Sequence, residues 1–270
     1  MTEFAPNRLR STTNVDKFEE LSNRTVDDQC EFFLKSFIFA LGDNWKDVPQ
    51  LCSEFKKHAK STGKTDDSMN HIQAADFLQK HGKTRTGTER KKELEDVDLN
   101  KDGQIKFIEY LMLHYKVLIL TEYYKRHEKA PEEDLSQDGI GLVGVGTKLL
   151  DEVLTMPEGL SAQLELAIET FSQTKRAREV KVGDLTSRAA AGGVKGMAAK
   201  NELVILDQQD MTEMNRIELT LAAAKRKGQK TSGSEALAKQ QAELASELKK
   251  EVDAKRAKMK ARAAMFEKKP

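Results

Sequence analysis

A twelve-residue segment places oxygen-bearing side chains at fixed intervals, in the order Asp98-Leu-Asn-Lys-Asp-Gly-Gln-Ile-Lys-Phe-Ile-Glu109. Asp98, Asn100 and Asp102 hold the first, third and fifth positions, a glycine holds the sixth, and Glu109 holds the twelfth. Ca²⁺ takes six to eight oxygen ligands, and this spacing supplies them, with the backbone carbonyl of Gln104 at position seven. The pattern predicts an EF-hand calcium loop between two helices, rather than a plain acidic turn.

A second and weaker copy of the loop is predicted upstream. When Ile72 is aligned with Ile105, 33 residues further on, the copy covers residues 65–76. It lacks the first acid and closes on an aspartate instead of a glutamate. EF-hands work in pairs joined by a short antiparallel contact, so we expect a degenerate structural partner that does not bind calcium usefully. The alternative is an ordinary helix–loop–helix.

One position of the downstream loop departs from the usual pattern. Lys106 holds the ninth position, where an oxygen that reaches the ion through water is common. An ammonium group has no oxygen to donate and repels a cation. We therefore expect the calcium affinity to be lower than that of a loop with an oxygen ligand at this position.

The remainder of the chain has the periodicity of helices. Apolar residues recur at spacings of three and four in residues 27–60, 107–126, 147–182 and 196–227. Residues 107–126 are apolar around most of the circumference, so we expect one long buried helix that leaves the calcium loop. The predicted fold class is all-α, with an EF-hand pair, one of them degenerate, followed by a bundle of long basic helices.

Shifts in composition predict five parts of the chain. These are a mobile N-terminal tail (1–25), an EF-hand domain (26–130) with loops 65–76 and 98–109, a linker (131–146), a helical domain with basic tracts (147–232), and a charged C-terminal helix (233–270).

The net charge of +1 hides a division between the two halves. Residues 1–139 carry 22 Lys/Arg and 26 Asp/Glu, a net of −4, whereas residues 140–270 carry 23 and 18, a net of +5. The cations of the second half concentrate at 175–181, 225–230 and 249–269. The basic half is expected to bind an acidic partner, although the last tract also fits a solvated helix face.

Several classes of protein are disfavoured by the composition. The mean hydropathy is −0.63 and no apolar run of 18 residues occurs, so we expect no membrane span. Cys30 and Cys52 give no disulfide framework, which fits a reducing cytoplasm. The five histidines form no zinc or protease motif, and we expect no enzyme. The basic tracts lack interleaved aromatic residues, which disfavours nucleic acid as a partner.

Two stretches resemble a known family. One runs from Glu89 to Lys116 and contains the calcium loop; the other is Gly193-Val-Lys-Gly-Met-Ala-Ala-Lys-Asn-Glu-Leu203 with the helix that follows to Lys227. Both are similar to the calcium-regulated actin-bundling proteins of amoebae and other protists, over about residues 30–230. The order also agrees, with EF-hands first and basic helices after.

The resemblance implies a cytoplasmic protein of the cytoskeleton that cross-links filamentous actin, with Ca²⁺ as its cofactor and calcium reducing the bundling. Residues 147–232 are then the actin-binding domain. Bundling needs two sites in one molecule or self-association, because a single site only decorates a filament. The expected metal ligands are Asp98, Asn100, Asp102, Gln104 and Glu109, and the candidate actin contacts are Lys175, Arg176, Arg178, Lys195, Lys200, Lys225, Arg226 and Lys227.

Two other functions stay open at this point. The chain fits a calcium sensor that binds a target other than actin through an exposed groove, and it fits a structural coiled-coil protein whose EF-hand only stabilises the fold. The division of charge also suggests a switch, in which the basic helices dock on the acidic half. Calcium would alter this docking through the rigid helix 107–126.

Overall fold

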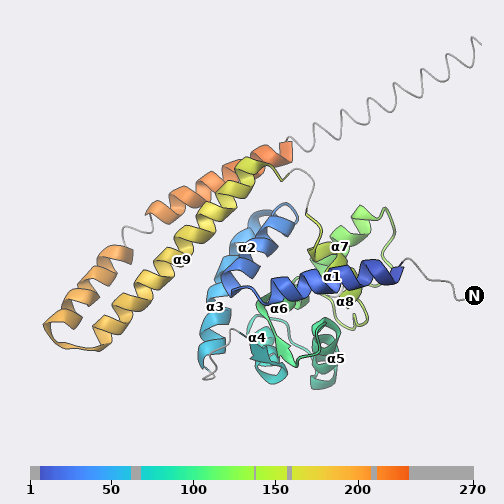
Figure 1. The fold of residues 1–270 in the computed structure, drawn as a ribbon, viewed down its shortest axis with the longest axis horizontal. Helices are drawn as coiled ribbons and strands as arrows, with labels where there is room; N and C mark the ends of the chain where they lie inside the picture. The colour runs from blue at the N-terminus through green and yellow to red at the C-terminus, as the bar shows by residue number, and fades with distance from the viewer. Residues whose placement is uncertain (1–6, 62–67, 137, 157–159, 208–211, 231–270) are drawn as a thin grey trace, which may run out of the picture. The chain divides into compact units, whose positions relative to one another are not determined.

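The computed structural model describes residues 7–61, 68–136, 138–156, 160–207 and 212–230, and the described chain is mostly helical (Figure 1). The elements in chain order are α1 (Asn7–Ser22), α2 (Val26–Phe37), the 3₁₀ helix η1 (Gly42–Lys46), α3 (Asp47–Ser61), β1 (Met69–Asn70), α4 (His71–Lys80), α5 (Gly87–Val97), β2 (Gln104–Ile105), α6 (Phe107–His114), α7 (Lys116–Arg126), α8 (Gly146–Val153) and α9 (Ala162–Ala190). Residues 193–207 and 212–230 are also helical.

Side chains placed just before the first turn begin several of these helices. Thr25 caps α2 by accepting a hydrogen bond from the Asp28 amide, and Ser161 caps α9 in the same way through the Leu164 amide. At α5, Thr86 and Glu89 form a reciprocal capping box. Each bond satisfies an amide that has no partner within its own helix, so these short sequence signals fix where the helices start.

Two helix–loop–helix units lie side by side through a two-residue antiparallel contact. The upstream unit is α3–β1–α4 and the downstream unit is α5–β2–α6, with Met69 opposite Ile105 and Asn70 opposite Gln104. The expected alignment of Ile72 with Ile105 is therefore wrong by three residues. Met69 and Ile72 lie three positions apart and are both apolar, but Met69 is fully buried while Ile72 is 81% exposed. The equivalent positions of the two units lie 36 residues apart.

Aromatic side chains from both units meet in the main core. The Phe55 ring lies 5.1 Å from that of Phe107 and 5.8 Å from that of Phe77, and the Phe77 ring lies 4.9 Å from that of Tyr110. Phe171 of α9 reaches the same core and meets Trp45 edge to face at 5.4 Å. The two units and the first part of α9 thus share one continuous apolar interior.

The N-terminal segment differs from the expected mobile tail of residues 1–25, because residues 7–22 form α1. Phe18 and Leu21 of α1 are buried in the main core. The sequence of this helix has little apolar periodicity, so the segment looked irregular. Its helix is stabilised by packing on the rest of the fold, which a local pattern does not report.

The expected single helix over 107–126 is two helices that are separated at Tyr115. This residue ends α6 and precedes α7 with φ −104° and ψ 21°, outside the helical region. The Tyr115 ring stacks on Phe33 at 5.5 Å, and the next residue, Lys116, turns its ammonium into the interior. No proline or glycine marks this break in the sequence, so tertiary contacts produce it.

Residues 131–146 were expected to form a linker, but they pack against α5 and α7. Lys116 Nζ donates to the Leu142 carbonyl (2.9 Å) and pairs with the buried Glu93 (3.0 Å). The Asp96 carboxylate accepts from the Val145 amide (3.1 Å). A Cβ atom at Gly146 would lie 2.3 Å from the Asp96 carbonyl, so glycine is needed here for the close approach.

The C-terminal part of α9 and the helix 193–207 form a hairpin with a small core of its own. Leu185, Ala199 and Leu206 make up this core, separate from the main one. The helix break expected near residues 189–193 is confirmed, since α9 ends at Ala190 and two glycines with positive φ follow. Gly196 lies against the end of α9, where a Cβ atom would meet the Ala189 carbonyl at 3.1 Å.

The chain divides into two compact units that differ from the predicted domains. The first runs from residue 1 to Lys225 and contains both the helix–loop–helix pair and α9. The boundary expected at residues 131–146 therefore does not separate two units. The second unit begins at Arg226, and the predicted charged helix 233–270 lies outside the described residues.

Candidate functional site

The downstream loop is folded on itself by its own acidic and amide side chains. The Asp98 carboxylate accepts from the Asp102 amide (3.2 Å) and the Gly103 amide (3.1 Å). Asp102 accepts from the Gln104 amide (2.7 Å), and the Asn100 amide group donates to Asp102 (2.8 Å). Gly103 has a φ of +68°, which suits a residue without a Cβ atom. The oxygens at positions one, three and five are thereby held in one turn of chain.

Glu109 closes the loop from the first turn of α6. It is fully buried, and its Oε2 accepts from the Lys106 amide (2.8 Å), which caps the helix. Its Oε1 is buried and has no hydrogen-bond partner among the described residues. Burial raises the pKa of Glu109 to about 8, and the charges of Asp98 and Asp102 add to this rise. The carboxyl group is therefore oriented by one oxygen, while the other is left unsatisfied in the interior.

This arrangement fits a hard divalent cation. A buried oxygen without a partner costs free energy on the order of 1–3 kcal/mol, and a cation ligated by it would remove that cost. The same cation would offset the repulsion between Glu109, Asp98 and Asp102. Within the described ranges, no three Asp, Glu, His or Cys side chains converge as a metal cluster. The expected ligand set also includes an amide and a backbone carbonyl, and Asp98 and Asp102 are bonded to loop amides in this conformation.

The upstream unit repeats the capping geometry with neutral chemistry. Gln73 occupies the position of Glu109, and its side-chain oxygen accepts from the Asn70 amide (2.9 Å). Asn70 occupies the position of Lys106 and accepts from the Gln73 amide (2.9 Å). The equivalent loop is thus 62–73 instead of 65–76, and its residues 62–67 lie outside those described. It closes on a neutral amide in place of a carboxylate.

A buried glutamine joins α6 to α2. The Gln29 side-chain oxygen accepts from the Ile108 amide (2.8 Å), and its nitrogen donates to the carbonyls of Ser22 (2.9 Å) and Arg24 (2.8 Å). Gln29 is buried on the apolar face of α2. Sequence reasoning missed this residue, although a polar side chain on an apolar helical face is a signal for a structural hydrogen bond.

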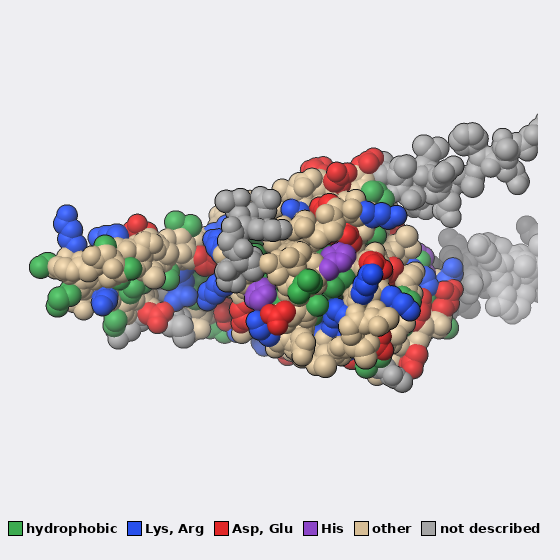
Figure 2. All heavy atoms as spheres, turned by 90° about the horizontal axis from the view of Figure 1, so that it is seen from below, with side chains coloured by type: hydrophobic (Ala, Val, Ile, Leu, Met, Phe, Trp, Pro, Cys, Tyr) green, Lys and Arg blue, Asp and Glu red, His purple; other side chains and the backbone are tan. Residues whose placement is uncertain are grey.

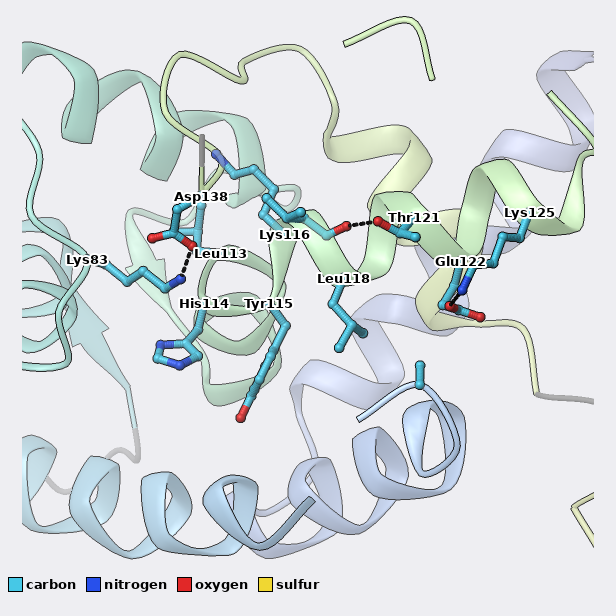
Figure 3. A pocket seen from close by; sticks show the side chains of 12 residues that line it. Lys83, Leu113, His114, Tyr115, Lys116, Leu118, Thr121, Glu122, Lys125 and Asp138 are labelled. Atoms are coloured by element: carbon cyan, nitrogen blue, oxygen red, sulfur yellow. Dashed lines mark hydrogen bonds and ion pairs between the residues drawn. The ribbon is translucent and has the colours of Figure 1, made fainter. Parts of the chain in front are cut away.

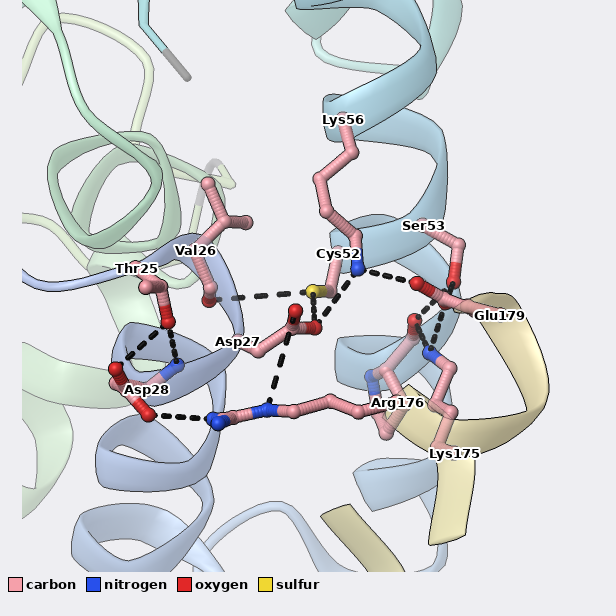
Figure 4. A network of polar contacts seen from close by, with 11 residues as sticks. Thr25, Val26, Asp27, Asp28, Cys52, Ser53, Lys56, Lys175, Arg176 and Glu179 are labelled. Atoms are coloured by element: carbon pink, nitrogen blue, oxygen red, sulfur yellow. Dashed lines mark hydrogen bonds and ion pairs between the residues drawn. The ribbon is translucent and has the colours of Figure 1, made fainter. Parts of the chain in front are cut away.

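The first turn of α2 is also where α9 docks (Figure 4). Arg176 of α9 pairs with Asp28 (2.5 Å), and Lys56 of α3 bridges Asp27 (2.8 Å) and Glu179 of α9. Figure 4 shows these side chains converging from the three helices. Burial opposes the ionisation of Asp28, but the hydrogen bonds from Thr25 and Arg176 outweigh it and lower its pKa. The partners of Glu179, chiefly Lys56, lower its pKa in the same way against burial.

The eight candidate basic residues divide into three groups. Three contact α2, η1 and α3: Arg176 through Asp28, Lys225 through the Gly42 carbonyl, and Lys175 through the Pro49 carbonyl. Arg178 pairs with Asp207 inside the hairpin (2.7 Å). The other four are exposed on the surface, namely Lys195, Lys200, Arg226 and Lys227. Of these eight residues, some therefore hold helices together inside the fold and others lie on the surface.

A cavity of about 430 Å³ opens beside the break between α6 and α7 (Figure 3). Its three lysines already have acidic partners: Lys83 pairs with Asp138 (2.6 Å), Lys125 with Glu122 (2.6 Å), and Lys116 with Glu93. Burial lowers the pKa of the neighbouring His114 to about 4, so this imidazole is neutral at pH 7. With its charges paired, the cavity belongs to the packing of the break.

The fold and the loop together define a class, namely a mostly helical protein with paired helix–loop–helix units, one of which carries a carboxylate-rich loop. None of the described helices combines the length and apolarity that crossing a membrane requires. The sequence pattern of the family "F actin bundling C terminal" matches residues 117–267, more than half of the chain. The chain therefore belongs to this family.

A relative and a crystal structure from Dictyostelium discoideum are similar to the chain. A calcium-regulated actin-bundling protein is 28% identical over 144 residues, which cover 52% of this chain and 39% of that protein. The chain thus matches about two fifths of the length of this relative. The crystal structure of a 34 kDa F-actin bundling protein is 20% identical, with coverage of 83% of this chain and 91% of that one, and a TM-score of 0.41.

Proposed function

We propose that this protein binds and bundles actin filaments under calcium control, as a cytoskeletal protein of the cytoplasm and not as an enzyme. Membership of the actin-bundling family carries the proposal, because the match spans α7, α8, α9 and the helices that follow. The name of the relative, which describes it as calcium-regulated, supports the second part.

The calcium site is proposed at the downstream loop of an EF-hand pair. Asp98, Asn100, Asp102 and Glu109 would supply side-chain oxygens and Gln104 its carbonyl, and the bound ion would supply positive charge to a buried cluster of acids. The unpartnered Oε1 of Glu109 supports this assignment. The upstream unit is proposed to act as a structural partner, because Gln73 provides one neutral oxygen where Glu109 provides a charged pair.

The contacts suggest how the loop is coupled to the basic helices. Glu109 holds the first turn of α6, and the Ile108 amide of that turn is bonded to Gln29 of α2. The residue directly before Gln29 on α2, Asp28, holds Arg176 of α9. A shift of the first turn of α6 would therefore move α2 and change how α9 packs on it. This route replaces the single rigid helix expected from the sequence, which is interrupted at Tyr115.

Filament contact is proposed for the exposed basic residues Lys195, Lys200, Arg226 and Lys227. Three other basic side chains already have partners on α2, α3 and η1, namely Arg176, Lys175 and Lys225. They could reach a filament only after undocking. Calcium is expected to reduce bundling, so the ion would favour an arrangement in which these residues stay docked.

Cosedimentation with filamentous actin tests the function directly. High-speed pelleting measures binding, and low-speed pelleting measures bundling, each with calcium and with a chelator. We expect pelleting in both assays, with less bundled actin when calcium is present. The matched variants are Lys195→Glu with Lys200→Glu on the surface, and Lys91→Glu with Lys92→Glu as an equal change of charge on α5. Equal loss from both pairs would contradict the assignment of the contact.

A second candidate is a calcium sensor for another target. An open groove of about 460 Å³ lies between α4 and α5, with Ile72, Ala75 and Leu94 in its walls. His71 at its edge contacts the Asp98 carboxylate (3.3 Å), so the groove adjoins the calcium loop. Ile72→Asp should leave actin bundling unchanged if actin is the target, and should abolish the calcium-dependent partner if the groove binds one.

A further inference from the structure

The first residue of α4 reaches across to the downstream loop. His71 Nε2 lies 3.3 Å from Asp98 Oδ2, and the two residues belong to different helix–loop–helix units. A carboxylate oxygen only accepts, so the imidazole is the donor in this contact. The His71 side chain is 30% exposed and that of Asp98 is 7% exposed. Figure 2 views the molecule from the side on which α4 and α5 lie in Figure 1, and it shows histidine side chains at that surface. The contact therefore joins a partly exposed ring to a buried carboxylate.

The pairing of the two units places His71 beside the loop. The antiparallel contact ends with Asn70 opposite Gln104, so His71 is the next residue and continues the register towards Gly103. The side chain of Asn70 also caps α4, which fixes the backbone where His71 begins the helix. The equivalent residue of the downstream unit is Phe107, which is fully buried in the core. The upstream unit thus has a polar side chain at a position where its counterpart only packs.

Two donors meet on one oxygen of Asp98. Its Oδ2 accepts from the Gly103 amide (3.1 Å) and from His71 (3.3 Å), while its Oδ1 accepts from the Asp102 amide (3.2 Å). A carboxylate that is held at one oxygen by two donors keeps its orientation, so the other oxygen keeps its position. Hydrogen bonds of this kind orient the ligands of metal sites. Oδ1 is therefore the oxygen that Asp98 can offer to a cation.

We propose that His71 is a positioning residue for the calcium site, an inference that rests on the calcium binding proposed for the downstream loop. His71 does not itself bind the ion. It holds Asp98, the ligand at the first loop position, in one orientation, so less order has to be imposed on this side chain when the ion binds. The upstream unit, which closes on the neutral Gln73, then contributes a side chain to the site of its partner in addition to apolar packing.

Calorimetric titration of the full chain with calcium tests this role through three substitutions. His71→Leu removes the donor and should weaken calcium binding about tenfold. His71→Gln carries a side-chain N–H group to a similar distance from the backbone as the imidazole, and it should restore most of the affinity. His71→Asn has the same amide group on a shorter side chain, and it should not restore the affinity. Thermal melts in chelator verify that each variant is folded, and the comparison of the two amides does not depend on the leucine variant.

The matched control is His81→Leu, also in the upstream unit. His81 Nε2 lies 3.2 Å from a carboxylate oxygen of Glu54, away from the downstream loop, so this variant should bind calcium as the parent chain does. Equal affinity of the parent chain and His71→Leu would overturn the positioning role alone, as would equal weakening by the control. Tighter binding by His71→Leu would also overturn it, because the bond would then hold Asp98 away from the ion. A parent chain that binds no calcium would overturn the calcium site as well.

Discussion

The two helix–loop–helix units share one backbone design and differ in chemistry. Met69 faces Ile105 across the short antiparallel contact, and both are fully buried. Gln73 and Glu109 make the same bond to the amide three residues before them, at 2.9 Å and 2.8 Å. The difference lies in the second side-chain atom, because Oε1 of Glu109 is buried without a hydrogen-bond partner among the described residues. Pairing of the units thus depends on apolar and backbone contacts, while the proposed calcium site depends on a few side chains.

The largest effect on calcium binding is expected when Glu109 of the downstream unit is replaced by glutamine, the residue at the equivalent upstream position. Glu109→Gln should weaken calcium binding at least about a hundredfold, or about 3 kcal/mol, because it removes a charged oxygen pair. The glutamine can keep the bond to the Lys106 amide, as Gln73 does with Asn70, so the melting temperature without calcium should not fall. Titration calorimetry and thermal unfolding measure the two quantities.

The reverse exchange is the matched control. Gln73→Glu should not create a second calcium site, because the upstream segment 62–73 begins with Thr62 where the downstream loop has Asp98. A calorimetric stoichiometry of two ions in this variant would show that the closing residue alone decides binding. Two ions in the unaltered chain would contradict the structural role proposed for the upstream unit.

The second contrast concerns a buried titratable group. His114 lies where the upstream unit has the buried Leu78, and burial lowers its pKa to about 4 from an ordinary value of 6.5. Between these values the unfolded chain binds more protons than the folded one, so His114 lowers the stability as the pH falls from 6.5 to 4. The expected loss is about 1–3 kcal/mol.

Chemical denaturation across this pH range measures the effect. His114→Leu should become more stable relative to the parent chain as the pH falls through the window. Because Glu109 titrates in both proteins, its contribution cancels in the difference. A difference that stays constant between pH 4 and 7 would show that His114 does not titrate in this window.

The third contrast is that the downstream unit is hydrogen-bonded to α2 at a position where the upstream unit is exposed. Ile108 is bonded to Gln29 through its amide, whereas its upstream counterpart Ile72 is exposed. Gln29→Leu should reduce the coupling between calcium and filament binding, with a loss of about 1–2 kcal/mol. Calcium titrations with and without filaments give the coupling. Ser36→Ala removes another buried hydrogen bond of α2, to Val153, and should leave the coupling intact.

The smallest effect is expected at the ninth loop position. Lys106→Asp should tighten calcium binding by about threefold to tenfold, because it replaces a repelling cation with an oxygen. Lys106→Asn introduces the upstream residue and removes only the positive charge, so it should produce part of this gain. Weaker binding by the aspartate variant would mean that Lys106 stabilises the loop instead.

Local patterns were enough to predict the features that depend on neighbouring residues. The ligand spacing of 98–109 predicted a loop between two helices, and the all-helical class followed from the spacing of apolar residues. The glycines near residue 192 predicted the turn of the hairpin. The sequence predicted a second helix–loop–helix unit beside the loop, but it placed the equivalent residues three positions too late. Met69 and Ile72 are both apolar and fit the paired position equally well in sequence.

The sequence by itself determined the family, the charge division and the spacing of the oxygen-bearing side chains in 98–109, since these depend on which residues occur and in what order. The tertiary structure decided which of them meet. Packing made α1 a helix through Phe18 and Leu21, and it broke 107–126 at Tyr115. It also docked Arg176 on Asp28 while it left Lys195 and Lys200 in solvent. Docking and exposure depend on contacts between residues far apart in the chain, and no local pattern records those contacts.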